Sequence, residues 1–207
     1  FNMVVGYRTL GDLTQILSGF SSRILKSECL DLPDKIYVQR NVTMSDEQKR
    51  IYNDLKEYAV AHLEDHEFMT TNNVMTQLLR MQQVLSGHTK SDDGNIIPVK
   101  DNRINELLNC LEEVEGKTII WSRFRFDVLR IKQTLEKEYG ETSVVSYFGD
   151  TSDEDRTLAI EKFQEGDAQF FVGNPQTGGM GITLTAAQNV IYFANSFDLA
   201  IRTQSED

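Results

Sequence analysis

The stretch Ala168–Leu184, AQFFVGNPQTGGMGITL, decides how the chain folds. Phe170–Val172 is a short apolar run typical of a buried strand. Gly173–Pro175 ends that strand, because proline lacks an N–H and restricts the residue before it. Thr177–Gly181 has glycine at three of its last four positions, which lets the backbone approach a ligand closely. Ile182–Ala187 then starts a helix or returns to the core. This pattern suits a phosphate group or a nucleic-acid backbone, although many glycine clusters are plain tight turns.

The region around this stretch alternates between helices and strands. Helical stripes ending at glycines separate compact apolar runs, as expected for parallel strands buried on both faces. The predicted strands are Thr118–Trp121, Ser143–Tyr147, Phe170–Val172 and Asn189–Phe193. The sequence therefore predicts an α/β fold with a parallel sheet flanked by helices.

The first half of the chain is predicted to be mainly helical. Ser45 and Gln48 form a capping box that opens one helix, and a second helix covers Asn73–Leu85. Residues 36–38 and 42–44 have extended character, and 88–100 is polar and aperiodic, so it marks a domain boundary. We expect a linker and the start of a helical protrusion over 1–43, a helical subdomain and loop over 44–100, and the α/β lobe over 101–207.

Composition limits the function. The net charge of −11 argues against a protein whose whole surface grips DNA, but it permits a local basic patch. Cys29 and Cys110 have no ligand-like spacing, which favours reduced thiols in the cytoplasm. No apolar run has membrane-spanning length, and no signal-peptide pattern opens the chain.

Parallel sheets bind ligands outside the carboxyl ends of their strands. Ser122 and Arg123 follow the first predicted strand, Gly149 and Asp150 follow the second, and the glycine-rich loop follows the third. This convergence favours a ligand site. Plain structural roles also fit these residues: a helix start after the first strand, a turn after the second, and a helix cap at Asp198.

Several common sites are missing. The chain has no GxxxxGK[ST] loop and therefore no phosphate-cradling P-loop. The acidic run Ser152–Asp155 stands at a predicted helix start, where acids are favoured, and no buried strand precedes it directly. We therefore expect no metal site in this chain.

The order of segments resembles the second half of a Swi/Snf-type superfamily-two helicase-like ATPase. The segments that carry the resemblance are SRILKSECLDLPDK (Ser22–Lys35), VTMSDEQKRIYNDL (Val42–Leu55), KTIIWSRF (Lys117–Phe124, motif IV), SYFGDTSDEDRTLAIEKFQ (Ser146–Gln164), and Asn174–Asp207, which covers motif V and the entrance to motif VI. Pro175, Gln176 and Thr177 replace the commoner Thr-Arg-Ala, as in the bacterial and phage variant. Gln204 matches the first residue of motif VI, whose two arginines lie beyond the end of this chain.

The resemblance implies a RecA-like second lobe of a motor that couples ATP hydrolysis, with magnesium, to movement along double-stranded DNA. The implied DNA-binding residues are Ser122, Arg123, Gly149, Asp150, Thr177 and Gly178. The implied ATP-binding residues are Gly179, Met180, Gly181 and Gln204. The P-loop and acidic box would lie in a first lobe, the partner of this one. The chain alone is then expected to hydrolyse no ATP, to hold no cofactor and to be cytoplasmic.

Two alternatives stay open. One is a non-catalytic interaction module whose acidic surface docks basic partners. The other is a dinucleotide-binding domain, which would place GxGxxG after its first strand, where this chain has Ser122 and Arg123 instead.

Overall fold

The structure is a computed structural model of the 207-residue chain. It describes residues 9–22, 24, 26–29, 31, 33–64, 71–91, 93–178 and 181–206. The chain divides into two compact units, Phe1–Arg40 and Asn41–Asp207, and each is described by itself. Within the described ranges, every helix is too short or too polar to span a bilayer.

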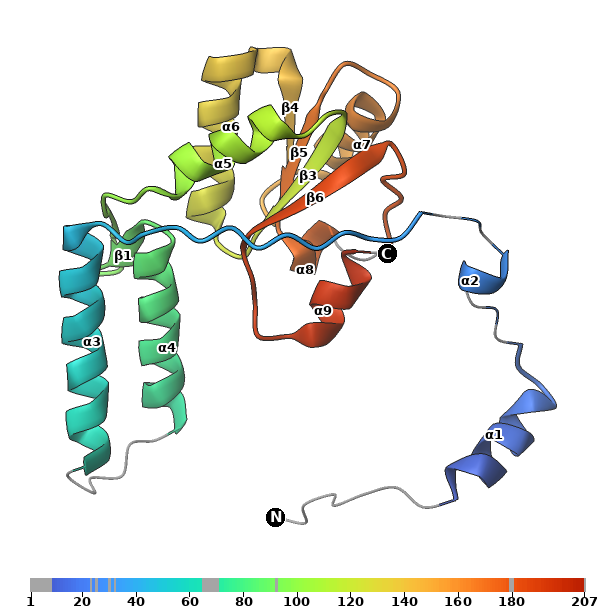
Figure 1. Cartoon of the computed structure of the whole chain (residues 1–207), viewed down its shortest axis with the longest axis horizontal. Coiled ribbons are helices and arrows are strands. Elements are labelled where there is room, and N and C mark those ends of the chain that lie inside the picture. Colours follow the sequence, from blue (N-terminus) through green and yellow to red (C-terminus); the bar gives the residue numbers. More distant parts are fainter. Residues whose placement is uncertain are drawn as a thin grey trace. The chain divides into compact units, whose positions relative to one another are not determined.

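The first unit contains the helices α1 (Leu10–Ser18) and α2 (Lys26–Cys29), labelled in Figure 1. The apolar side chains of α1, such as Ile16, are exposed within this unit. Residues 36–38 and 42–44, which were predicted to be extended, belong to no strand in the structure. Apolar β-branched residues favour a strand only where another strand pairs with them.

The second unit begins with a helical hairpin, α3 (Asp46–Glu64) and α4 (Thr71–Leu85), which pack side by side (Figure 1). The capping box is confirmed. The Ser45 N–H donates to Gln48 Oε1 at 3.0 Å, and the Gln48 N–H donates to Ser45 Oγ at 3.1 Å. These bonds satisfy N–H groups that have no partner inside the helix.

The stretch predicted as an aperiodic loop is instead a small antiparallel hairpin. β1 (His88–Lys90) pairs with β2 (Ile96–Pro98) and packs on α4. Each strand has three residues, too few to display a period; only the start of β1 is buried, and the apolar residues of β2 are exposed throughout. The domain boundary placed in this stretch stays a prediction.

The predicted parallel sheet is confirmed. β3 (Lys117–Ser122), β4 (Val144–Tyr147), β5 (Phe170–Gly173) and β6 (Ala187–Ala194) form one parallel sheet in the order β4-β5-β3-β6. The helices around it are α5 (Arg103–Glu113), α6 (Arg125–Tyr139) and α7 (Asp153–Gln164), and a short 3-10 turn, η1 (Glu141–Ser143), precedes β4.

Side chains of β3 alternate between two buried clusters. Ile120 packs with residues of α5 and α6 on one face of the sheet. Ile119 and Trp121 pack with Ala159 and Phe163 of α7 on the other face. Figure 1 shows the resulting three layers. Both faces are covered, so the central residues of the strands are runs of mainly apolar side chains, as the sequence indicated.

Candidate nucleic-acid interface at the strand ends

The carboxyl ends of the four strands meet at one edge of the sheet, here called the strand-end edge. Hydrogen bonds connect the segments that follow the strands. The Arg123 N–H donates to the Ala194 carbonyl at 3.2 Å, and the Asn174 N–H donates to the Tyr147 carbonyl at 3.1 Å. The Asn174 side-chain amide donates to the Arg123 carbonyl at 2.8 Å. The residues that follow β3 and β5 are therefore hydrogen-bonded to each other and to the last residues of β4 and β6.

The glycine-rich loop begins with a helical turn, α8 (Pro175–Gly178), which the sequence reasoning missed. Asn174 caps this turn, since its Oδ1 accepts the Gln176 N–H at 2.9 Å and its carbonyl accepts the N–H groups of Thr177 and Gly178. Asparagine is frequent at the cap of a helix, and proline is frequent at the first helical position. The sequence therefore contained a signal for this helix.

The predicted phosphate-binding loop lies partly within this turn. Thr177 is half-buried and Gly178 is buried. Gly179 and Met180 lie outside the described residues. Gly181 is exposed and has a φ of +76°, a conformation that glycine adopts without strain. The chain then returns to the core without a helix, since Ile182 packs against the cluster beneath α7.

Trp121 supports the loop from below. A Cβ added to Gly173 would lie 2.8 Å from the Trp121 ring and 2.7 Å from the Tyr147 carbonyl oxygen. A Cβ added to Gly178 would lie 3.1 Å from the Trp121 ring and 3.1 Å from the Tyr147 ring. The glycines at these positions let the loop lie directly on the two aromatic side chains.

Gln204 is exposed and ends helix α9 (Leu199–Gln204), which begins at the predicted cap Asp198. The Trp121 indole N–H donates to the Ser205 carbonyl at 3.3 Å, and Tyr192 OH lies 2.6 Å from Ser205 Oγ. The C-terminal end of α9 is therefore anchored to the same tryptophan that supports α8, and α8 and α9 are in contact.

Ser122 is fully buried, and its hydroxyl donates to the Asp127 carboxylate at 2.7 Å. A DNA phosphate contact by this hydroxyl stays a prediction, but in the structure the hydroxyl faces the protein interior. Asp127 lies in the first turn of α6, so the bond ties the end of β3 to the helix that follows.

Two arginines follow Ser122 and have different partners. Arg123 is half-buried, and its Nη1 donates to Gln82 Oε1 of α4 at 2.7 Å. Arg125 is exposed and forms an ion pair with Asp150 at 2.7 Å. Arg125 was absent from the predicted site. Its partner lies 25 residues further along the chain, so only the folded structure brings the two charges together.

Gly149 is exposed beside this ion pair, and its carbonyl accepts a hydrogen bond from Arg156 of α7 at 3.3 Å. The Arg156 guanidinium carbon lies 5.4 Å from the centroid of the Tyr147 ring. The loop after β4 is thus fixed by arginines on both sides. In a chain with a net charge of −11, the strand-end edge gathers Arg123, Arg125 and Arg156.

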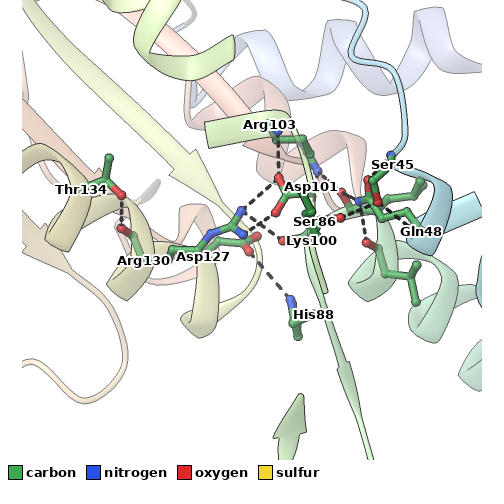
Figure 2. Close-up of polar contacts among 12 residues, drawn as sticks. Ser45, Gln48, Ser86, His88, Lys100, Asp101, Arg103, Asp127, Arg130 and Thr134 are labelled. Atoms are coloured by element: carbon green, nitrogen blue, oxygen red, sulfur yellow. Dashed lines mark hydrogen bonds and ion pairs between the residues drawn. The ribbon is translucent and has the colours of Figure 1, made fainter. Parts of the chain in front are cut away.

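A cluster of polar side chains, here called the polar joint, lies next to this edge between the helical hairpin and the lobe (Figure 2). It contains His88, Asp101, Asp127 and Arg130. His88 Nδ1 and Asp127 Oδ1 face each other at 3.9 Å, and both side chains are buried. Burial raises the pKa of Asp127 from 3.8 to about 6, because desolvation disfavours the charged carboxylate. Burial lowers the pKa of His88 from 6.5 to about 4 for the same reason. Arg130 pairs with Asp101 at the edge of this joint.

The fold is that of a RecA-like helicase C-terminal lobe, and comparison with known proteins agrees. Residues 99–207, more than half of the chain, match the helicase conserved C-terminal domain, and the chain belongs to this family. Its parallel sheet flanked by helices is that of the C-terminal lobe of SWI2/SNF2 ATPases.

Two solved structures and two curated relatives illustrate the likeness. The core of the Sulfolobus solfataricus SWI2/SNF2 ATPase in complex with double-stranded DNA is 25% identical, with a TM-score of 0.65 over 88% of this chain and 40% of that one. The core domain alone is 24% identical, with a TM-score of 0.66 over 95% of this chain and 42% of that one. YwqA of Bacillus subtilis, named as a putative ATP-dependent helicase/translocase, is 25% identical over 97% of this chain. The ATP-dependent helicase FUN30 of Saccharomyces cerevisiae is 29% identical over 80% of this chain. The chain spans only 23% of YwqA and 14% of FUN30.

Proposed function

We propose that this chain is the second motor lobe of an ATP-dependent DNA translocase, in which a first lobe supplies the P-loop and the magnesium-binding acids. The observation that carries the proposal is the strand-end edge, where Arg123 and Asn174, the cap of α8, are hydrogen-bonded to each other and to the last residues of β6 and β4. A SWI2/SNF2 core of this fold has been solved with double-stranded DNA.

In this proposal the edge binds phosphates without reading sequence. Backbone N–H groups, a threonine hydroxyl and arginines fix the position of a duplex but carry no base information, which suits a motor that moves along any DNA. Arg123 and Thr177 contact the phosphate backbone, while Gly179, Met180, Gly181 and Gln204 face ATP bound by the first lobe. The lobe alone hydrolyses no ATP and works in the cytoplasm.

The proposal is tested by the salt dependence of duplex binding. Each phosphate neutralised by a cationic side chain contributes about 0.9 to the slope of log K against log salt. Arg123→Ala is expected to lower that slope by about 0.9 in anisotropy titrations of labelled duplex. Thr177→Ala should weaken binding with the slope unchanged, since a neutral hydroxyl releases no counterion.

Lys137→Ala is the matched control, because Lys137 lies in the last turn of α6, away from the strand-end edge. An unchanged slope in Arg123→Ala would contradict the phosphate contact. In a protein that carries both lobes, Arg123→Ala and Thr177→Ala should also reduce DNA-stimulated ATP hydrolysis. A non-catalytic docking module instead predicts unchanged hydrolysis.

The ion pair between Arg125 and Asp150 yields a separate prediction. A carboxylate neutralises the guanidinium and repels phosphate, so Asp150→Asn should free Arg125 for DNA. We expect tighter duplex binding and a slope that is larger by up to about 0.9. Glu154→Gln is the control, because it removes one exposed acid from the first turn of α7. Weaker binding in Asp150→Asn would show instead that Asp150 itself supports DNA binding.

A further inference from the structure

The guanidinium of Arg123 is held by a residue of the helical hairpin, which lies outside the parallel-sheet lobe. Gln82 of α4 accepts from Arg123 Nη1 at 2.7 Å, although 41 positions separate the two residues in the sequence. Gln82 is half-buried, and the hydrogen bond is that of a neutral amide with a cation. The bond uses one of the five N–H donors of a guanidinium and leaves its charge intact.

The backbone of Arg123 is fixed on both sides. Its N–H donates to the Ala194 carbonyl at the end of β6, and its carbonyl accepts from the Asn174 side chain at the start of α8. The guanidinium carbon lies 5.8 Å from the Phe124 ring centroid. The remaining freedom of Arg123 is that of its long side chain, and Gln82 restricts it.

Gln82 is itself held in place. Gln48 Nε2 of α3 donates to the Val84 carbonyl at 2.9 Å, and Arg103 Nη1 of α5 donates to Ser86 Oγ at 3.3 Å. The first bond joins the C-terminal end of α4 to α3 within the hairpin, and the second joins it to α5 of the lobe, at the polar joint in Figure 2. The backbone of the helix end that carries Gln82 is therefore fixed beside the strand-end edge.

We propose that Gln82 is a positioning residue that pre-organises Arg123 for a DNA phosphate. This inference rests on the proposed function, since it assigns the helical hairpin a role in the phosphate contact of the lobe. It also distinguishes the two arginines. Arg123 is oriented by a neutral amide and keeps its charge available for DNA, whereas Arg125 is neutralised by a carboxylate. Removing the partner should weaken binding in the first case and strengthen it in the second.

The test is duplex binding by this chain with Gln82→Ala, Gln82→Glu, Arg123→Ala and the double variant Gln82→Ala/Arg123→Ala. Binding pays about 0.5–1.5 kcal/mol to immobilise a flexible side chain, so Gln82→Ala should weaken it about 2- to 12-fold with the salt slope unchanged. Gln82→Glu should neutralise Arg123 and lower the slope by up to about 0.9, as Arg123→Ala does. In the Arg123→Ala background, Gln82→Ala should have no further effect.

Gln133→Ala on the exposed face of α6 is the matched control, and thermal unfolding by circular dichroism checks that the variants fold. If Arg123→Ala lowers the slope but Gln82→Ala binds like the wild type, the positioning role is wrong and the phosphate contact stands. The positioning role is also wrong if Gln82→Ala weakens binding equally in both backgrounds. If Arg123→Ala leaves the slope unchanged, the proposed function of Arg123 fails, and the role of Gln82 fails with it.

Discussion

Trp121→Ala is expected to lower the free energy of unfolding by about 3–5 kcal/mol, the usual cost of removing a large buried aromatic side chain. Trp121 is 1% exposed, lies against Phe171 with ring centroids 5.9 Å apart, and supports both glycines at the ends of α8 and β5. Its loss also leaves the Ser205 carbonyl without the indole N–H. Urea denaturation followed by circular dichroism measures the change.

Trp121→Phe separates packing from hydrogen bonding. Phenylalanine keeps an aromatic ring beneath the loop but loses the indole N–H and part of the ring system. The missing hydrogen bond should cost about 1 kcal/mol, and the smaller ring adds a packing cost. A loss below about 1 kcal/mol in Trp121→Ala would mean that the loop and α9 do not depend on this side chain.

Replacing either member of the buried pair His88 and Asp127 should make the free energy of unfolding depend on pH, with opposite sign in the two variants. Asp127 has its pKa raised from 3.8 to about 6 in the folded state, so the folded protein binds this proton more tightly. Its contribution to stability therefore falls as pH rises from about 4 to about 6, by up to about 3 kcal/mol. His88 has its pKa lowered from 6.5 to about 4, so the folded protein binds that proton less tightly. Its contribution rises over nearly the same pH range by a similar amount.

In the wild type the two effects offset each other. Asp127→Asn leaves the His88 effect alone, so stability should rise by up to about 3 kcal/mol between about pH 4 and 6.5. His88→Gln leaves the Asp127 effect alone, and stability should fall over this range. Arg130 acts on both residues, Lys90 and Asp101 act on His88, and Arg103 acts on Asp127.

Urea denaturation at a series of pH values tests both variants, and the double variant Asp127→Asn/His88→Gln should be as insensitive to pH as the wild type. Parallel pH profiles in the two single variants would contradict the assignment of opposite pKa shifts. The Asp127→Asn substitution keeps a side-chain carbonyl that can still accept the Ser122 hydrogen bond, so the end of β3 should keep its position in this variant.

The periodicity of the chain was enough to predict the sheet and its helices. An apolar run that ends at glycine or proline locates the end of a strand. The helix caps at Ser45 and Ser152 are local signals, and their hydrogen bonds in the structure confirm them. The short strands β1 and β2 escaped, because three residues are too few to display a period. α8 was not predicted because the glycine-rich stretch is typical of a turn, although Asn174 and Pro175 are typical of a helix start.

Polar residues and glycines follow the apolar strand runs in the sequence, and the carboxyl ends of parallel strands share one edge, so the site at this edge could be predicted from the sequence. The contacts that those residues make there follow from the folded structure alone. It turned the Ser122 hydroxyl inward to Asp127, paired Arg125 with Asp150, and brought Gln82 to Arg123. The physical reason is that caps and strands depend on neighbours within a few positions, whereas the charge that an arginine offers to DNA depends on partners that folding brings from 25 and 41 residues away.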